Sequence, residues 1–144
     1  MKKCLICRED FKPFVDFGRM PIANAFSTQK ELKNEYFFSM RVGFCSNCNM
    51  VQLLEQPDRE KMFHDSYAFF SSTSNHMMNH FKKFANSIIT IQNLAEKSFV
   101  VEIGSNDGIM LQNFLSKNIP CLGVEPSKNV AHVSMEKGIN VITE

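Results

Sequence analysis

The sequence contains no long hydrophobic run, and its positive and negative charges almost cancel. No stretch approaches the roughly 18 consecutive apolar residues of a membrane-spanning helix, and residues 1–7 hold too few apolar residues for a signal peptide. The chain has 16 basic and 15 acidic residues, a formal net charge of +1, so it has no field to attract nucleic acid or an anionic membrane. These absences predict a cytoplasmic protein with neither of those partners.

Cysteine is infrequent but strongly patterned. Four of the five cysteines form two C-x-x-C pairs, Cys4 with Cys7 and Cys45 with Cys48, with 37 residues between the pairs. Two such turns can present four sulfurs to one ion and leave no open coordination position, which is the arrangement of a structural zinc site. The alternatives are four buried apolar cysteines or one redox pair. We expect one structural Zn²⁺, with Cys121 as a small buried residue outside the site.

The residues around the cysteine pairs predict a small β-rich domain. Residues 36–45 and 50–54 are β-rich runs on either side of the second pair, and together they predict a hairpin whose turn the metal holds. Residues 14–26 contain Gly18, Pro21 and Asn24, which indicate an ordered loop of turns. So few residues bury little apolar surface, so folding of this domain should depend on the metal.

The second half opens with an apolar run that breaks at a glycine loop. Residues 99–108 read F-V-V-E-I-G-S-N-D-G and are followed by a helical pattern, as at the start of a nucleotide-binding βαβ unit. Gly104 and Gly108 are present, but the third glycine of the pyrophosphate-binding fingerprint is missing. The loop therefore suits S-adenosylmethionine better than a dinucleotide. Glu125, at the end of the next strand, is the candidate acceptor for the ribose hydroxyls.

Other patterns complete the first part of an α/β domain. Apolar residues recur at three- and four-residue steps from residue 75 to 97, which predicts an amphipathic helix. Helices over 109–117 and 129–137 and strands over 121–125 and 139–142 follow. An open parallel sheet normally has five or more strands, so we expect the first part of a Rossmann-like domain.

Residues 58–74 are rich in aromatic and hydroxyl side chains, and two interpretations stay open. They can pack the two domains together, with Ser and Thr residues capping the next helix. Alternatively they form a wall of the substrate or cofactor site, where an aromatic face attracts a sulfonium and a phenol acts as an acid or base.

Together these motifs resemble the sugar C-methyltransferases of deoxysugar biosynthesis, which join an N-terminal zinc-binding domain to an S-adenosylmethionine-dependent methyltransferase domain. The resemblance depends on the paired C-x-x-C motifs, G-R-M-P-I-A-N-A-F (18–26), C-S-N-C-N-M-V-Q-L (45–53), M-F-H-D-S-Y-A-F-F-S-S-T-S (62–74), E-I-G-S-N-D-G-I-M-L (102–111) and G-V-E-P-S-K-N-V-A (123–131). It implies an α/β protein in three parts: a zinc-binding domain (1–56), an aromatic linker and active-site segment (57–74), and the N-terminal part of the methyltransferase domain (75–144).

The resemblance also implies a substrate and a set of site residues. The substrate would be a nucleotide-diphosphate 4-ketosugar methylated at carbon 3, with Tyr67 as the catalytic candidate. The candidate cofactor-binding residues are Ser71, Ser72, Glu102, Gly104, Asn106, Asp107, Gly108 and Glu125. The family's remaining acid/base groups would lie beyond Glu144, so we expect no turnover by this chain unless a second polypeptide supplies them. The alternative function is a zinc-binding interaction module, or a remnant methyltransferase without catalysis.

Overall fold

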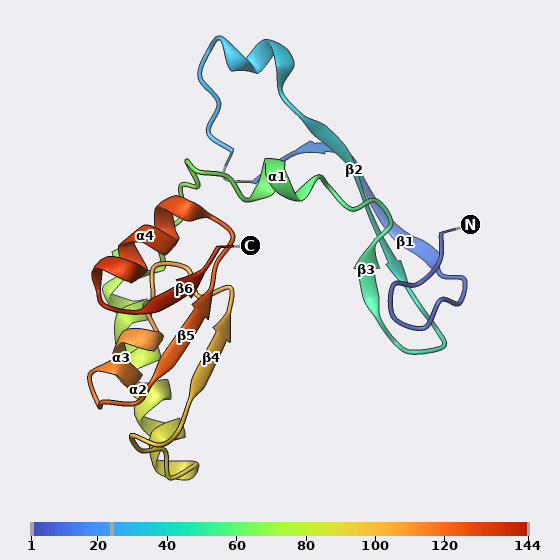
Figure 1. Ribbon diagram of the computed structural model, residues 1–144. Coiled ribbons are helices and arrows are strands. Elements are labelled where there is room, and N and C mark those ends of the chain that lie inside the picture. Colours follow the sequence, from blue (N-terminus) through green and yellow to red (C-terminus); the bar gives the residue numbers. More distant parts are fainter. Residues whose placement is uncertain (1, 24, 144) are drawn as a thin grey trace. The chain divides into compact units, whose positions relative to one another are not determined.

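The computed structural model describes residues 2–23 and 25–143 and divides the chain into two compact units, Met1–Met62 and Phe63–Glu144 (Figure 1). The boundary falls within residues 57–74, the aromatic segment that was predicted to be a linker. Among the described residues, no helix is both long and apolar enough to cross a membrane.

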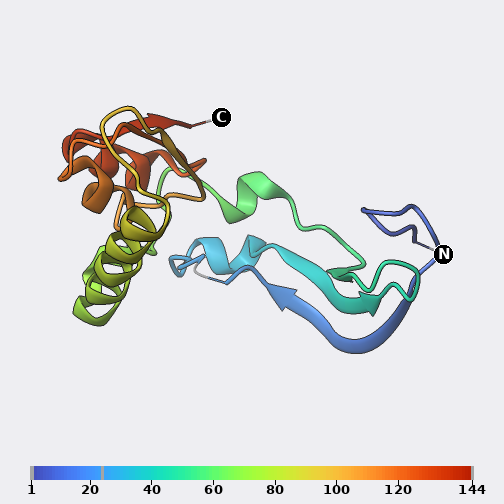
Figure 2. The same ribbon diagram turned by 90° about the horizontal axis from the view of Figure 1, so that it is seen from below.

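The first unit is a three-stranded antiparallel sheet of order β1-β2-β3, formed by β1 (Lys12–Pro21), β2 (Phe37–Phe44) and β3 (Val51–Leu53). Strands β1 and β2 run side by side as a long ribbon (Figure 2). A 3₁₀ turn, η1 (Glu31–Asn34), lies between them in sequence, and the short helix α1 (Arg59–Met62) ends the unit. The predicted hairpin across the second cysteine pair is confirmed as β2 and β3.

The expectation of a loop over residues 14–26 was wrong, because most of this stretch belongs to β1. Its pairing with β2 shifts register between Asp16 and Arg19. Gly18 lies in this irregularity with φ +74°, and its backbone N–H donates a hydrogen bond to Asp16 Oδ1 at 2.8 Å. Pro21 is the last residue of the strand. The residues that indicated turns therefore mark a bulge and a strand end. Asn24 lies outside the described residues.

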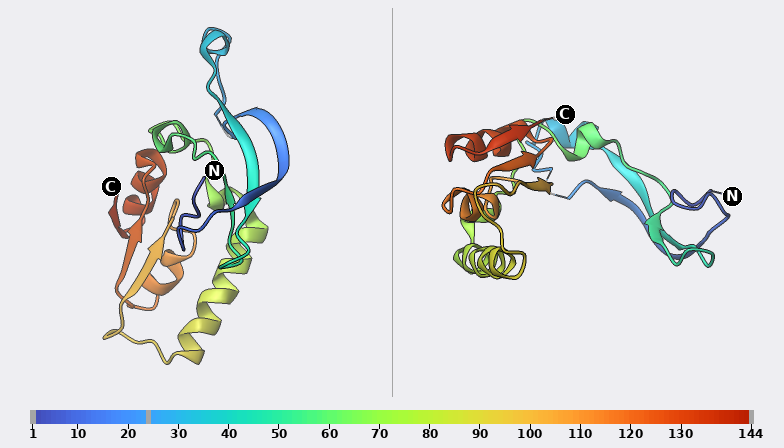
Figure 3. Two further views of the ribbon diagram at one scale, coloured as in Figure 1. Left: turned by 90° about the vertical axis from the view of Figure 1, so that its right-hand side faces the viewer. Right: turned by 60° about the horizontal axis from the view of Figure 1, so that its bottom comes forward.

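The second unit contains a parallel sheet of order β4-β5-β6, with β4 (Val100–Ile103), β5 (Cys121–Val124) and β6 (Asn140–Ile142). Its helices are η2 (Ser71–Thr73), α2 (Asn75–Ile91), α3 (Leu111–Leu115) and α4 (Lys128–Glu136). Helices α2, α3 and α4 lie on the same side of the sheet (Figures 1 and 3). The strand and helix order agrees with the sequence prediction. The predicted helices over 75–97 and 109–117 are shorter in the structure.

The core of the second unit lies between the sheet, α2 and α3. It comprises the buried residues Ala85, Leu111, Phe114, Ile119, Cys121 and Ile139. Cys121 is 5% exposed, as expected for a small core residue. Ser74 immediately precedes helix α2, and its hydroxyl accepts a hydrogen bond from the Met77 N–H at 3.3 Å, so a serine caps the helix as expected. The core supports the edge at which the strands end and the loops begin.

Candidate functional site

The four paired cysteines converge in the first unit. All four sulfur atoms lie within 4.8 Å of one another, with Cys4 and Cys48 3.6 Å apart and Cys7 and Cys45 3.4 Å apart. Four thiolates at about 2.3 Å from a central Zn²⁺ would be separated by about 3.8 Å. Cys4 and Cys45 are fully buried, whereas Cys7 and Cys48 are partly exposed. The donor set and its spacing therefore fit a tetrahedral zinc ion.

The two cysteine pairs have the same backbone geometry. In each, the first cysteine donates its N–H to a carbonyl five residues later and accepts an N–H from the residue four later. The hydrogen bonds are Cys4 to Glu9 (2.8 Å), Arg8 to Cys4 (3.0 Å), Cys45 to Met50 (2.9 Å) and Asn49 to Cys45 (2.8 Å). Arg8 and Asn49 have left-handed φ values of 65° and 60°. The turns are thus two copies of one knuckle, each aiming two sulfurs at a common point.

Hydrogen bonds to the sulfur of Cys4 favour its thiolate form. A hydrogen bond from the Cys7 backbone is the largest cause that lowers the pKa of the Cys4 thiol, to about 6. Gln52 contributes as well, because its Nε2 donates to Cys4 Sγ at 3.1 Å while its Oε1 accepts the Leu5 N–H at 3.0 Å. Gln52 is 8% exposed. Sequence reasoning missed this residue, since a glutamine in an apolar strand carries no metal-binding signal by itself.

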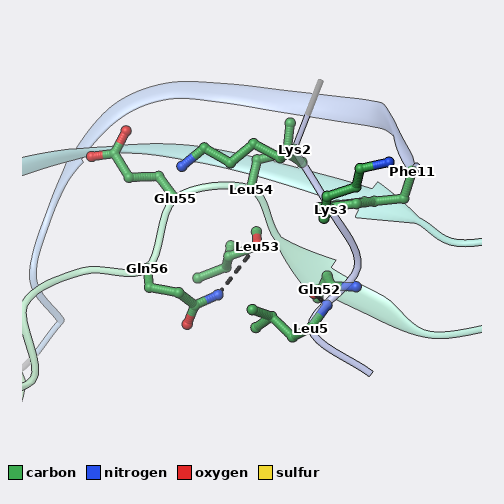
Figure 4. A pocket seen from close by; sticks show the side chains of 9 residues that line it. All are labelled: Lys2, Lys3, Leu5, Phe11, Gln52, Leu53, Leu54, Glu55 and Gln56. Atoms are coloured by element: carbon green, nitrogen blue, oxygen red, sulfur yellow. Dashed lines mark hydrogen bonds between the residues drawn. The ribbon is translucent and has the colours of Figure 1, made fainter. Parts of the chain in front are cut away.

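Gln52 also forms part of a hollow of about 270 Å³ in the same unit (Figure 4). Its wall includes apolar side chains of the small core, such as Phe11 and Leu54, and the lysines Lys2 and Lys3. Lys3 forms a 3.0 Å ion pair with Asp10. The hollow and the four cysteines belong to the first unit, and Gln52 contributes to both.

The glycine loop connects β4 to α3 in the second unit. Gly104, Asn106 and Gly108 all have positive φ, at 75°, 49° and 76°. A side chain at Gly108 would meet Ile139 and Ser134 of the underlying layer, so this glycine is required by packing as well as by its backbone conformation. At Gly104 a Cβ would meet no atom within 4 Å. The loop therefore leaves open space at Gly104.

Glu125 follows β5, and its carboxylate holds the glycine loop. Its Oε2 accepts the Asn106 N–H at 3.0 Å, and its Oε1 accepts the Ser127 N–H at 2.8 Å. The residue is 5% exposed. Each oxygen keeps capacity for a second hydrogen bond. The carboxylate predicted to bind ribose is thus adjacent to the loop, and it also has a structural role that sequence reasoning did not identify.

Asn106 and Asp107 join the glycine loop to the aromatic segment. Asn106 Oδ1 accepts the Ser71 N–H at 2.9 Å, and its Nδ2 donates to the Phe69 carbonyl at 3.0 Å. Asp107 Oδ2 accepts hydrogen bonds from the Ser72 N–H, at 3.0 Å, and from the Ser72 hydroxyl. The structure therefore brings together two pairs of predicted site residues, Ser71 with Asn106 and Ser72 with Asp107. The members of each pair are 35 positions apart in the sequence.

Glu102 lies at the end of β4 and is partly buried. Burial raises the pKa of its carboxyl group to about 7, and its Oε2 has no hydrogen-bond partner among the described residues. A buried carboxylate oxygen of this kind suits a cationic or hydrogen-bond-donating ligand. Together with the space at Gly104, it makes the loop compatible with S-adenosylmethionine, which carries a sulfonium and an ammonium group.

Tyr67 is partly exposed, and its backbone is anchored to α4. The Asn129 side chain donates through Nδ2 to the Tyr67 carbonyl at 2.7 Å. The rings of Phe63 and Tyr67 have centroids 6.1 Å apart. Asn129 belongs to the motif G-V-E-P-S-K-N-V-A, but no local pattern assigned its side chain this contact. The catalytic role of Tyr67 stays a prediction.

Comparison with known proteins agrees with this geometry. Residues 4–63 match the family model described as "Putative zinc binding domain". The chain is also 27% identical over 142 residues to the C-methyltransferase NovU of Streptomyces niveus. Over nearly its whole length, the chain is therefore similar to part of a C-methyltransferase. The aligned region covers 97% of this chain and 34% of that relative, so the chain spans about a third of the length of the methyltransferase it matches.

Proposed function

We propose that this chain forms the zinc-binding and cofactor-binding part of an S-adenosylmethionine-dependent C-methyltransferase with a Rossmann-like second domain. The substrate class that we propose is a nucleotide-diphosphate 4-ketosugar, methylated at carbon 3. The observation that carries the cofactor proposal is the contact between Glu125 and the glycine loop. It joins the ends of two neighbouring parallel strands, the edge where α/β sheets bind ligands.

The residues of the second unit suit distinct parts of this cofactor. The Glu125 carboxylate can accept hydrogen bonds from the ribose hydroxyls, and the open space at Gly104 allows the backbone to approach the ligand closely. Glu102 offers an unpartnered carboxylate oxygen to a positive group. Two acidic residues, Glu102 and Glu125, lie near the ends of neighbouring strands, and the loop between them has no side chain at Gly104. This combination supports S-adenosylmethionine over a dinucleotide.

The proposed chemistry is proton removal followed by carbon–methyl bond formation. Loss of the proton next to the ketone gives an enolate, whose carbon forms the new bond. Bound S-adenosylmethionine would supply the electrophilic methyl group, and cleavage of its sulfur–methyl bond would leave S-adenosylhomocysteine. The phenol of Tyr67 is our candidate to exchange a proton with the sugar, and its backbone is fixed by Asn129. Activity of the complete enzyme would require residues from the part of the relative that this chain does not cover.

Calorimetric titration of the full chain with S-adenosylmethionine tests the cofactor proposal. We expect binding by the wild-type chain and a loss of about 10- to 100-fold in affinity for Glu125→Gln, the range for a hydrogen-bonded charged group. Glutamine keeps the size of the side chain and one acceptor oxygen for the loop. Glu96→Gln, at an exposed position, is the matched control.

Two results would contradict the proposal in different ways. Unchanged affinity in Glu125→Gln would remove the ribose assignment alone. No binding by a zinc-loaded wild-type chain would reject cofactor binding by this part of the protein and favour the alternative, a zinc-binding interaction module.

A further inference from the structure

The aromatic segment of the second unit is held by side chains of the glycine loop. We call residues 67–72 the strap. The strap belongs to no strand of the sheet, yet three of its backbone groups have side-chain partners in the loop. A segment held by side chains in this way loses these three hydrogen bonds when the side chains are removed.

Asn106 bonds to the strap as a neighbouring strand would. Its amide donates to the Phe69 carbonyl and accepts from the Ser71 N–H, two groups that lie two residues apart on the same edge of the chain. A residue in an adjacent parallel strand makes this same pair of bonds through its own N–H and C=O. Asparagine is suited to the position because its short side chain ends in one donor group and one acceptor, and because it tolerates the left-handed φ of 49° found here.

Asn106 also contacts Glu125 through its backbone. Its N–H donates to Glu125 Oε2 at 3.0 Å, so one residue connects the strap to the carboxylate proposed to bind the cofactor. Asp107 reinforces the connection by accepting the Ser72 N–H. Asp107 is fully buried, and the Lys137 ammonium donates to its backbone carbonyl at 2.5 Å. Asp107, the glycine-loop residue that contacts Ser72, is therefore fixed in its position by burial and by this hydrogen bond.

We infer that Asn106 is a positioning residue that fixes the strap on the glycine loop and couples it to Glu125. On this inference, the Asn106 side chain and Asp107 Oδ2 act on the strap rather than on the ligand. The coupling to the cofactor depends on the proposed function. Because coupling between two sites is reciprocal, cofactor held at Glu125 stabilises the strap, and loss of the strap contacts weakens cofactor binding.

Amide hydrogen exchange, followed by nuclear magnetic resonance on the full chain, tests the positioning role without any ligand. In Asn106→Gly, which keeps the left-handed backbone and removes the amide, we expect exchange of the Ser71 N–H to quicken about tenfold or more. Asn118→Gly is the matched control, because Asn118 is also left-handed, with φ 57°, and is exposed. It should leave the Ser71 exchange rate unchanged.

Equal Ser71 exchange rates in the wild type and Asn106→Gly would overturn the inference. Should Asn106→Gly fail to fold, Asn106→Asp serves instead, since aspartate keeps the size of the side chain and tolerates the left-handed backbone but cannot donate to the Phe69 carbonyl. The inference then requires faster exchange of the Ser72 N–H by a few-fold, and an unchanged rate rejects it.

A second measurement separates this inference from the proposed function. With saturating S-adenosylmethionine, exchange of the Ser71 N–H should slow in the wild type, and Asn106→Gly should bind the cofactor several-fold more weakly. Absence of cofactor binding by the wild type would refute the proposed function and the coupling, while the ligand-free exchange rates still decide the positioning role. Cofactor binding with no change in Ser71 exchange would refute the coupling alone.

Discussion

Glu102 should make the stability of the second unit depend on pH in an unusual direction. Burial raises the pKa of its carboxyl group from 4.5 to about 7. In the unfolded chain the same group is solvated and loses its proton near pH 4.5. As pH rises, the unfolded state therefore ionises first. The contribution of Glu102 to the free energy of unfolding is therefore fully present below about pH 4.5 and is lost as pH rises through 7.

The magnitude follows from the size of the shift. A pKa difference of this size corresponds to about 3 kcal/mol without screening. Glu102 is only partly buried, so solvent screening reduces the expected loss of stability to about 1 to 2 kcal/mol between pH 5 and pH 8. Glu102→Gln removes the titrating group while keeping nearly the same volume. Its stability should therefore fall less over this interval than that of the wild type, by about the same 1 to 2 kcal/mol.

Urea unfolding at pH 5 and pH 8, followed by the helical circular dichroism signal, measures this difference. The longest helices, α2 and α4, belong to the second unit, so the signal reports mainly on that unit. Glu96→Gln, at an exposed position before β4, should retain the pH dependence of the wild type. Parallel pH–stability curves for the wild type and Glu102→Gln would refute the burial argument.

Two further predictions concern the first unit. Gly43→Ala should destabilise this unit by about 1 to 3 kcal/mol in thermal unfolding, because the new methyl group would overlap the buried Phe11 ring; Ser39→Ala on the same strand is the control, and equal melting curves would contradict the prediction. Cys45→Ser should lose the zinc measured by elemental analysis, whereas Cys121→Ala, outside the tetrad, should keep it; retention of zinc by Cys45→Ser would count against the four-cysteine site.

The metal centre could be predicted from sequence because its geometry is local. Each C-x-x-C pair is a short turn, and the residues that follow, Arg8 and Asn49, need only adopt a left-handed conformation to complete it. Only the approach of the two turns to each other is a long-range contact. A four-coordinate ion needs both cysteine pairs as ligands, so this approach could be expected from the sequence. The second coordination layer, represented by Gln52, could not be predicted, because it depends on which face of β3 approaches Cys4.

Strand β1 shows where local signals mislead. Gly18 and Pro21 predict turns when they are considered alone, yet the strand continues through Gly18 by means of a bulge. The Asp16 side chain satisfies the Gly18 N–H there, which removes the cost of the irregular pairing. The long partner β2 decides the outcome, since pairing along its length outweighs two unfavourable residues. A single sequence does not reveal that partner's register.

The glycine loop has one feature that local sequence predicts and another that depends on distant contacts. Its backbone could be predicted, since Gly104 and Gly108 have the left-handed φ values that such a loop requires. The partners of Asn106 and Asp107 could not, because they lie 35 residues away in a segment without regular pairing. Resemblance to a family assigned these two residues to the cofactor, whereas the hydrogen bonds give them protein partners. Contacts between distant irregular segments require coordinates.

The two units differ in what stabilises them, and this difference bears on function. In the hydrophobic cluster of the first unit, two of the four buried residues, Cys4 and Cys45, are candidate metal ligands, and the other two are Phe11 and Leu54. Removing the ion would leave close-packed thiols that repel one another when ionised, together with too little apolar surface to compensate. The second unit has an apolar core between sheet and helices and no such dependence. Metal loss should therefore unfold the first unit and leave the glycine loop, Glu125 and the strap intact, because all of these belong to the second.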